Sequence, residues 1–220
     1  TAVGYNALTT DTAGFNAAFG YTAGAAISTG TRNTAVGPAA LDAASTGDDN
    51  TALGANALGA TTTASDNTAV GSYAGGAITT GTRNVAVGYA ALDAATTASD
   101  NTYVGSGAGS ANTSGDHNTG IGQASMDELT TGANNTAVGS KSLSGVVTGS
   151  SNTAVGVSAL VGNTSGASNV AMGLNALFTN TTGDNNVALG GSAMYYNTTA
   201  DANTAIGYAA LNANPTGTRN

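Results

Sequence analysis

The sequence predicts an all-β fold, a parallel β-roll or β-solenoid of about thirteen short rungs built on a 17-residue repeat. Three observations predict it. An Asn recurs at every seventeenth position from Asn16 to Asn220 without a slip, and a Gly follows four residues after each of these Asn up to Gly207. Between the two lies a short alternating segment, Thr-Ala-Val in most copies. Self-similarity at a fixed short period is the signature of repeat architectures whose stacked units share one core.

The repeat is numbered here from its Asn as position 1. Its consensus is Asn-Thr-Ala-Val-Gly-x-x-Ala-Leu-x-x-x-Thr-Thr-Gly-x-x. It covers residues 1–220 as a single array, and only the first repeat, which contains Gly4, is one residue short, with 16 residues. Because the chain begins inside a motif, we expect it to be a segment of a longer fibrous chain.

The composition favours a thin, repeated core over a thick globular one. Gly accounts for 33 of 220 residues, charged residues for 7%, and Ala supplies much of the apolar content. The net charge of −8 with only four basic residues argues against nucleic-acid binding, which needs a basic stripe. No run approaches the ~18 apolar residues of a membrane span, so we expect no membrane insertion by this segment.

The alternating segment predicts one strand with two distinct faces, because side chains of a strand alternate. Position 4 is apolar in every copy, and position 2 changes from Thr to Val at Val85, Val170 and Val187. We therefore expect positions 2 and 4 to point inward. The opposite face carries Ala and Gly, which let another backbone approach closely, and this predicts a seam between subunits. The seam residues are Ala35, Ala52, Ala69, Ala86, Tyr103, Gly120, Ala137 and Ala154.

Two departures from the consensus predict local packing. Tyr103 replaces the seam Ala and the next repeat has Gly120 there, so we expect the Tyr103 ring to pack over Gly120. Position 9 is Leu or Met in most repeats but Gly in three. In two of these an Ile three residues later is expected to refill the lost volume, whereas in the third Asn112 leaves the space incompletely filled. The pairs are Gly24 with Ile27, Gly75 with Ile78, and Gly109 with Asn112.

The invariant Asn predicts a ladder in which side-chain amides bond from rung to rung. A second interpretation is that Asn tolerates a left-handed corner, and both can hold. The expected ladder residues are Asn33, Asn50, Asn67, Asn84, Asn101, Asn118, Asn135, Asn152, Asn169, Asn186 and Asn203.

Charged residues mark the corners of each rung. Ten of the sixteen lie at positions 16 and 17, four lie at positions 10 and 11, and none falls in positions 1 to 5. This distribution predicts that each rung has two solvated corners and that two short strands run between these corners.

The sequence offers little for catalysis, so we expect no enzyme activity and no cofactor. There is no Cys, and the one His, His117, falls at a corner, where a solvated turn residue is the simplest interpretation. The many Ser and Thr have no recurring base beside them. Acidic corners such as Asp66-Asn67 offer oxygen ligands but too few carboxylates for calcium, so we expect no metal.

The motif Asn-Thr-Ala-Val-Gly-x-x-Ala-Leu resembles the head repeats of YadA-like trimeric autotransporter adhesins. The longer form with Thr-Thr-Gly before the next Asn, as in residues 169–186, is similar to arrays in phage tail-fibre proteins. The resemblance covers essentially the whole chain. It implies a left-handed parallel β-roll, a homotrimer of three rolls packed around an axis, and an extracellular location on a virion tail fibre or a bacterial surface.

The expected function is therefore structural and adhesive. The chain would extend a trimeric fibre and present surface for attachment to a host cell. A cell-surface glycan or protein receptor would meet the variable corners, where Tyr195 and Tyr196 are candidate contacts; that the corners only decorate a shaft stays open. The alternatives are a self-assembling extracellular filament and a monomeric solenoid that binds ice or carbohydrate through its recurring Thr-Thr pairs.

Overall fold

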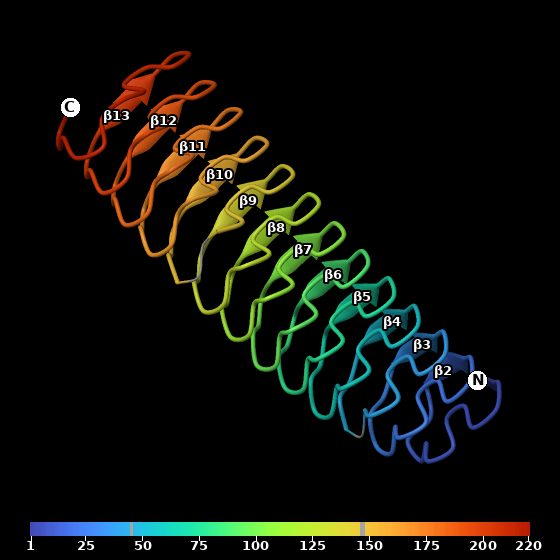
Figure 1. The fold of residues 1–220 in the computed structure, drawn as a ribbon. Coiled ribbons are helices and arrows are strands. Elements are labelled where there is room, and N and C mark those ends of the chain that lie inside the picture. The colour runs from blue at the N-terminus through green and yellow to red at the C-terminus, as the bar shows by residue number, and fades with distance from the viewer. Residues whose placement is uncertain (45, 146–147) are drawn as a thin grey trace. The chain divides into compact units, whose positions relative to one another are not determined.

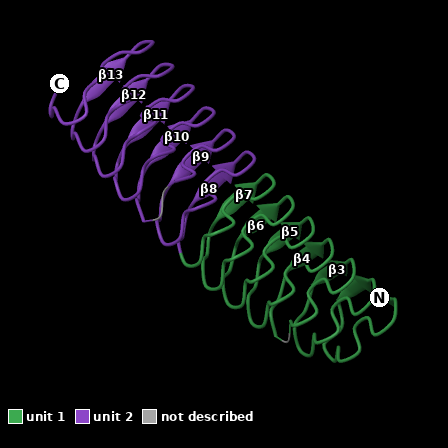
Figure 2. Ribbon diagram, viewed as in Figure 1, with its two compact units in different colours: residues 1–114 green, residues 115–220 purple. Residues whose placement is uncertain are grey.

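The computed structural model describes residues 1–44, 46–145 and 148–220, and it shows a parallel β-solenoid with 17-residue rungs (Figure 1). The described residues contain strands and turns but no helix. The chain divides into two compact units, residues 1–114 and 115–220 (Figure 2). The predicted fold class and repeat length are thus confirmed.

Each rung contributes one strand of two or three residues, at positions 2 to 4 of the repeat. In the first unit these are β1 (Ala2–Val3), β2 (Ala17–Phe19), β3 (Thr34–Val36), β4 (Thr51–Leu53), β5 (Thr68–Val70), β6 (Val85–Val87) and β7 (Thr102–Val104). In the second unit they are β8 (Thr119–Ile121), β9 (Thr136–Val138), β10 (Thr153–Val155), β11 (Val170–Met172), β12 (Val187–Leu189) and β13 (Thr204–Ile206).

Within each unit, consecutive strands pair in parallel so that identical repeat positions lie side by side. Ala35 pairs with Ala52, for example, 17 residues away. The expected second strand of each rung is wrong for the described residues, because the chain after position 5 runs through turns. These turns are still joined between rungs, as where the Leu41 N–H donates to the Ala57 carbonyl at 3.0 Å. Hydrogen bonds therefore hold the stack outside the strands as well.

The Gly at position 5 is required by the close stacking of rungs. Gly37 has φ of +127°, a conformation that side-chain-bearing residues rarely adopt, and a Cβ built on it would lie 2.7 Å from the carbonyl oxygen of Gly54 in the next rung. Any side chain here would push the two rungs apart, which explains why the Gly recurs without exception up to Gly207.

The predicted facing of the strands is wrong. Position 3 points into the roll, and from Ala18 onward its Ala side chains are almost fully buried within a single chain. Positions 2 and 4 point outward and are half-buried or exposed. The interior is narrow and is already filled from the other walls by positions 8, 9 and 12, so only a methyl group fits at position 3. The residues assigned to a subunit seam, and found buried instead, are Ala35, Ala52, Ala69, Ala86, Tyr103, Gly120, Ala137 and Ala154.

The expected exchange of volume between positions 9 and 12 is confirmed. A Cβ on Gly24 would lie 3.0 Å from Cδ1 of Ile27, and a Cβ on Gly75 would lie 3.0 Å from Cδ1 of Ile78. Both Ile side chains are buried. The Ile therefore occupies the volume that Leu fills in the other rungs.

Two predictions that involve Tyr103 are wrong. Its side chain is fully buried inside its own rung and does not point out onto a seam beside Gly120. A Cβ on Gly109 would lie only 2.5 Å from Cε1 of this ring. The space over Gly109 is therefore filled by Tyr103, and Asn112, expected to leave it partly empty, donates from Nδ2 to the Tyr103 hydroxyl at 3.3 Å.

Candidate functional site

The invariant Asn forms the predicted ladder inside each unit. Asn50 donates its backbone N–H to Oδ1 of Asn33 at 2.9 Å and its Nδ2 to the same oxygen at 3.1 Å. The second hydrogen on Nδ2 goes to the Ala64 carbonyl at 2.8 Å, across the rung. The left-handed residue at this corner is the preceding one, Asp49, with φ of 59°, and no ladder Asn has a positive φ. The ladder, and not a left-handed corner, therefore explains the Asn.

A second buried ladder was missed from the sequence. Asn180 donates Nδ2 to Oδ1 of Asn163 at 2.8 Å, and Asn197 donates to Oδ1 of Asn180 at 2.9 Å. All three lie at position 12 and are fully buried. The signal was present, because Asn recurs at position 12 in the last rungs up to Asn214.

The outer strand face, formed by positions 2 and 4 of β1–β7 and of β8–β13, carries a row of exposed apolar side chains in each unit. Its position 4 side chains stand in register, since the strands pair without slip. The clearly exposed ones in the first unit are Val3, Phe19 and Leu53, and those in the second unit are Ile121, Val138, Met172 and Ile206. A contiguous row of exposed apolar side chains is typical of an interaction surface.

The two candidate receptor residues lie together with a third aromatic side chain. Tyr195 stacks on Phe178 with ring centroids 4.9 Å apart and planes 10° apart. Tyr196 meets Tyr195 edge-on at 4.7 Å and is 55% exposed. Only Tyr196 of the predicted pair therefore offers much free surface.

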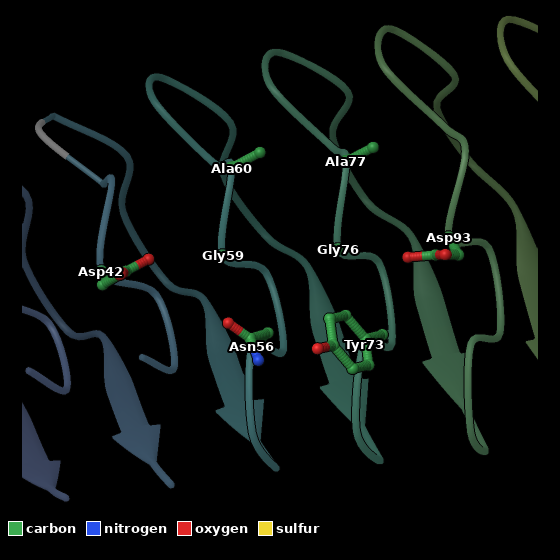
Figure 3. A pocket seen from close by; sticks show the side chains of 8 residues that line it. All are labelled: Asp42, Asn56, Gly59, Ala60, Tyr73, Gly76, Ala77 and Asp93. Carbon is green, nitrogen blue, oxygen red and sulfur yellow. The ribbon is translucent and has the colours of Figure 1, made fainter. Parts of the chain in front are cut away.

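A groove of about 410 Å³ opens at one corner of the first unit and was not foreseen (Figure 3). It exists because position 10, which carries a side chain in most rungs, is Gly in two consecutive ones. We call it the glycine groove; its lining residues are Asp42, Asn56, Gly59, Ala60, Tyr73, Gly76, Ala77 and Asp93.

The two ends of the glycine groove are acidic. Asp42 and Asp93 stand at position 10 of the flanking rungs, and in Figure 3 their carboxylates point toward one another over Gly59 and Gly76. A Cβ on Gly76 would lie 2.7 Å from Oδ1 of Asp93, which confirms that this carboxylate leans over the floor. Burial raises the pKa of both carboxyl groups.

The acidic corner at positions 16 and 17 behaves differently where it carries an Arg in the preceding rung. Arg32 donates to both carboxylate oxygens of Asp49, at 2.6 and 2.7 Å, and Arg83 does the same to Asp100. The hydrogen bonds from Arg32 lower the pKa of the Asp49 carboxyl. Both pairs join neighbouring rungs at an exposed edge.

Other candidate chemistry is sparse. His117 lies at an exposed corner, as expected. Of the residues that the structure describes, no three His, Cys, Asp or Glu lie together in a way that could hold a metal ion. The Thr at position 13 use their hydroxyls within the fold, as when Thr62 and Thr79 each donate to the carbonyl 17 residues on.

Comparisons with family models, curated proteins and solved structures find no match for this chain. Over the described part of the chain, no helix long and apolar enough to cross a membrane is found.

Proposed function

We propose that the chain is a structural segment of an extracellular trimeric fibre, and that three copies associate through the outer strand face. The observation that carries the proposal is the in-register apolar row at position 4 of β1–β7 and of β8–β13. The resemblance of the repeat to trimeric adhesin heads and phage tail-fibre arrays supports the number of chains and the extracellular setting.

The energetics support association at this face. Burying a Val or Leu side chain contributes about 1.5–3 kcal/mol, so even partial burial of one such residue per rung sums to a large term. Thr at position 2 places a hydroxyl beside each apolar side chain and limits the cost of exposure before assembly.

The mass of the full chain in native buffer tests the proposal. Light scattering is expected to give about 62 kDa, three times the chain mass of 20.8 kDa. Leu53→Asp combined with Val138→Asp should give a folded single chain, because each places a charge on the outer strand face. Thr63→Asp, at an exposed position away from that face, is the matched control and should leave the mass unchanged. A single-chain mass for the unaltered protein would contradict the proposal and favour a monomeric solenoid.

We also propose that Tyr196 is a contact for a cell-surface glycan or protein receptor, since exposed aromatic side chains supply much of the energy in binding hot spots. The Tyr195 ring, which is stacked on Phe178, meets the Tyr196 ring edge-on and supports it. Tyr196→Ala should weaken attachment of the fibre to host cells. Tyr208→Ala, at an even more exposed ring, is the control and should not.

A further inference from the structure

We propose that the glycine groove binds an elongated organic dication, a linear α,ω-diamine, with one ammonium group against Asp42 and the other against Asp93. The groove lies at positions 7, 10 and 11 of the repeat, away from the outer strand face. The proposal therefore does not depend on how chains associate.

The shape of the groove suits an unbranched chain. Gly59 and Gly76 form a floor without side chains, and the methyl groups of Ala60 and Ala77 line one wall. Tyr73, 46% exposed, lines the groove from position 7. Methylene groups can lie along the Gly and Ala surface, while an aromatic face beside them attracts a cation.

Charge complementarity identifies the ends of the ligand. Within the described part of the chain, neither Asp42 nor Asp93 lies in an ion pair, whereas Asp49 and Asp100 are paired with Arg32 and Arg83. Both groove carboxylates are half-buried and carry the cost of desolvation. An ammonium group at each end would offset that cost with a charge-assisted hydrogen bond.

The spacing limits the length of the ligand. Asp42 and Asp93 are three rungs apart, which places their Cα atoms about 14 Å apart at ~4.8 Å per rung. Both side chains lean inward over the floor by about 2 Å each, and each ammonium–carboxylate contact takes up about 2.8 Å, so about 5 Å remains between the two nitrogen atoms and a diamine of about three carbons fits best.

The test is a calorimetric or NMR titration of the full chain with 1,3-diaminopropane. Two probes of the same length, 1-aminopropane and 1,3-propanediol, serve as controls. The diamine should bind about three- to fivefold more tightly than the monoamine, since a partly exposed ion pair contributes up to about that factor. The diol should not bind, and diamines of six and eight carbons should bind more weakly than that of three.

Variants locate the site. Asp42→Asn and Asp93→Asn should each reduce the affinity for the diamine to that for the monoamine. Gly59→Phe should abolish binding by filling the floor; position 10 already accepts Phe178 in another rung, and a Cβ at Gly59 meets nothing closer than 3.3 Å. Asp66→Asn, at an exposed corner, is the control and should change nothing. Absence of saturable diamine binding, equal binding of monoamine and diamine, or unchanged binding in folded Asp42→Asn and Gly59→Phe would each overturn the proposal.

Discussion

The ring of Tyr103 occupies the space that a side chain on Gly109 would need, within one rung of the first unit. Most other rungs solve the same packing problem with Ala at position 3 and Leu or Met at position 9. In this rung the large residue, Tyr103, lies in the strand at position 3, and the small residue, Gly109, lies in the turn at position 9. The two positions therefore form one packing unit.

This exchange predicts a strong coupling between Tyr103 and Gly109. Tyr103→Ala should lose about 3–5 kcal/mol of unfolding free energy through the cavity it leaves. Gly109→Leu alone should also destabilise, because the new side chain collides with the ring. The double variant restores the arrangement of Ala154 and Leu160 beside Asn163, and it should recover most of the loss. Urea unfolding of the four proteins measures the coupling, and additive losses would contradict it.

The inward facing of position 3 predicts an asymmetry between adjacent strand residues. Ala69→Leu should lose about 1–3 kcal/mol because it overfills a closed interior. Thr68→Val, one residue earlier, should change stability by less than about 0.5 kcal/mol, since position 2 points outward and is already Val in the paired strand β6. Thermal unfolding compares the two, and equal effects would argue against the observed facing.

The repeat length, the strand positions and the Asn ladder could all be predicted, because each depends on spacing along the chain. Which strand face points into the interior could not be predicted, because alternation defines two faces of a strand without indicating which one is enclosed. Apolar Val at position 4 suggested an interior, yet Leu58 and its equivalents at position 9 already fill it. In a rung this narrow, the smallest side chains mark the inside.

The glycine groove was hidden for a different reason. Gly59 and Gly76 are separated by one full rung, and only stacking brings them side by side. Asp42 and Asp93 were assigned to a solvated corner, which is where they lie. Both carboxylates can lean over the groove because Gly59 and Gly76 have no side chains there. This arrangement involves four stacked rungs, so it cannot be recognised from a single repeat.

The ladder predicts a large cost for losing one Asn. Asn67→Ala removes the acceptor of the Asn84 backbone N–H and Nδ2, at 3.0 and 3.1 Å, and the donor to the Gly81 carbonyl. With several buried polar groups left unpaired, the loss should be about 2–5 kcal/mol. Denaturant unfolding measures it. Asn56→Ala, at a half-buried corner position that is Ala39 in the preceding rung, is the control and should cost far less.

A buried hydroxyl predicts a stabilising substitution. Thr61 is fully buried at position 12, and its Oγ1 has no hydrogen-bond partner. Thr61→Val keeps the shape and removes the desolvation cost, so it should gain about 1 kcal/mol in unfolding free energy. Thr62→Val removes a hydroxyl that donates to the Thr79 carbonyl, and it should not stabilise. A loss of stability in Thr61→Val, measured in the same urea titration, would show that the hydroxyl does have a partner.

Two acidic residues at different corners predict opposite dependences on pH. Burial raises the pKa of Asp42, so the folded state holds its proton more tightly than the unfolded state, and stability falls as pH rises through this carboxyl's titration. Asp42→Asn should therefore stabilise at pH 7, and the gain should vanish near about pH 3.

Arg32 lowers the pKa of the Asp49 carboxyl group. The Asp49 carboxylate therefore contributes stability above its ordinary pKa, and this stability is lost as pH falls through the lowered value. Asp49→Asn should destabilise slightly at pH 7, and the difference should shrink on acidification. Thermal unfolding of both variants and the parent at the two pH values decides the matter, and the same sign for both variants at pH 7 would refute the assignment of burial to one corner and ion pairing to the other.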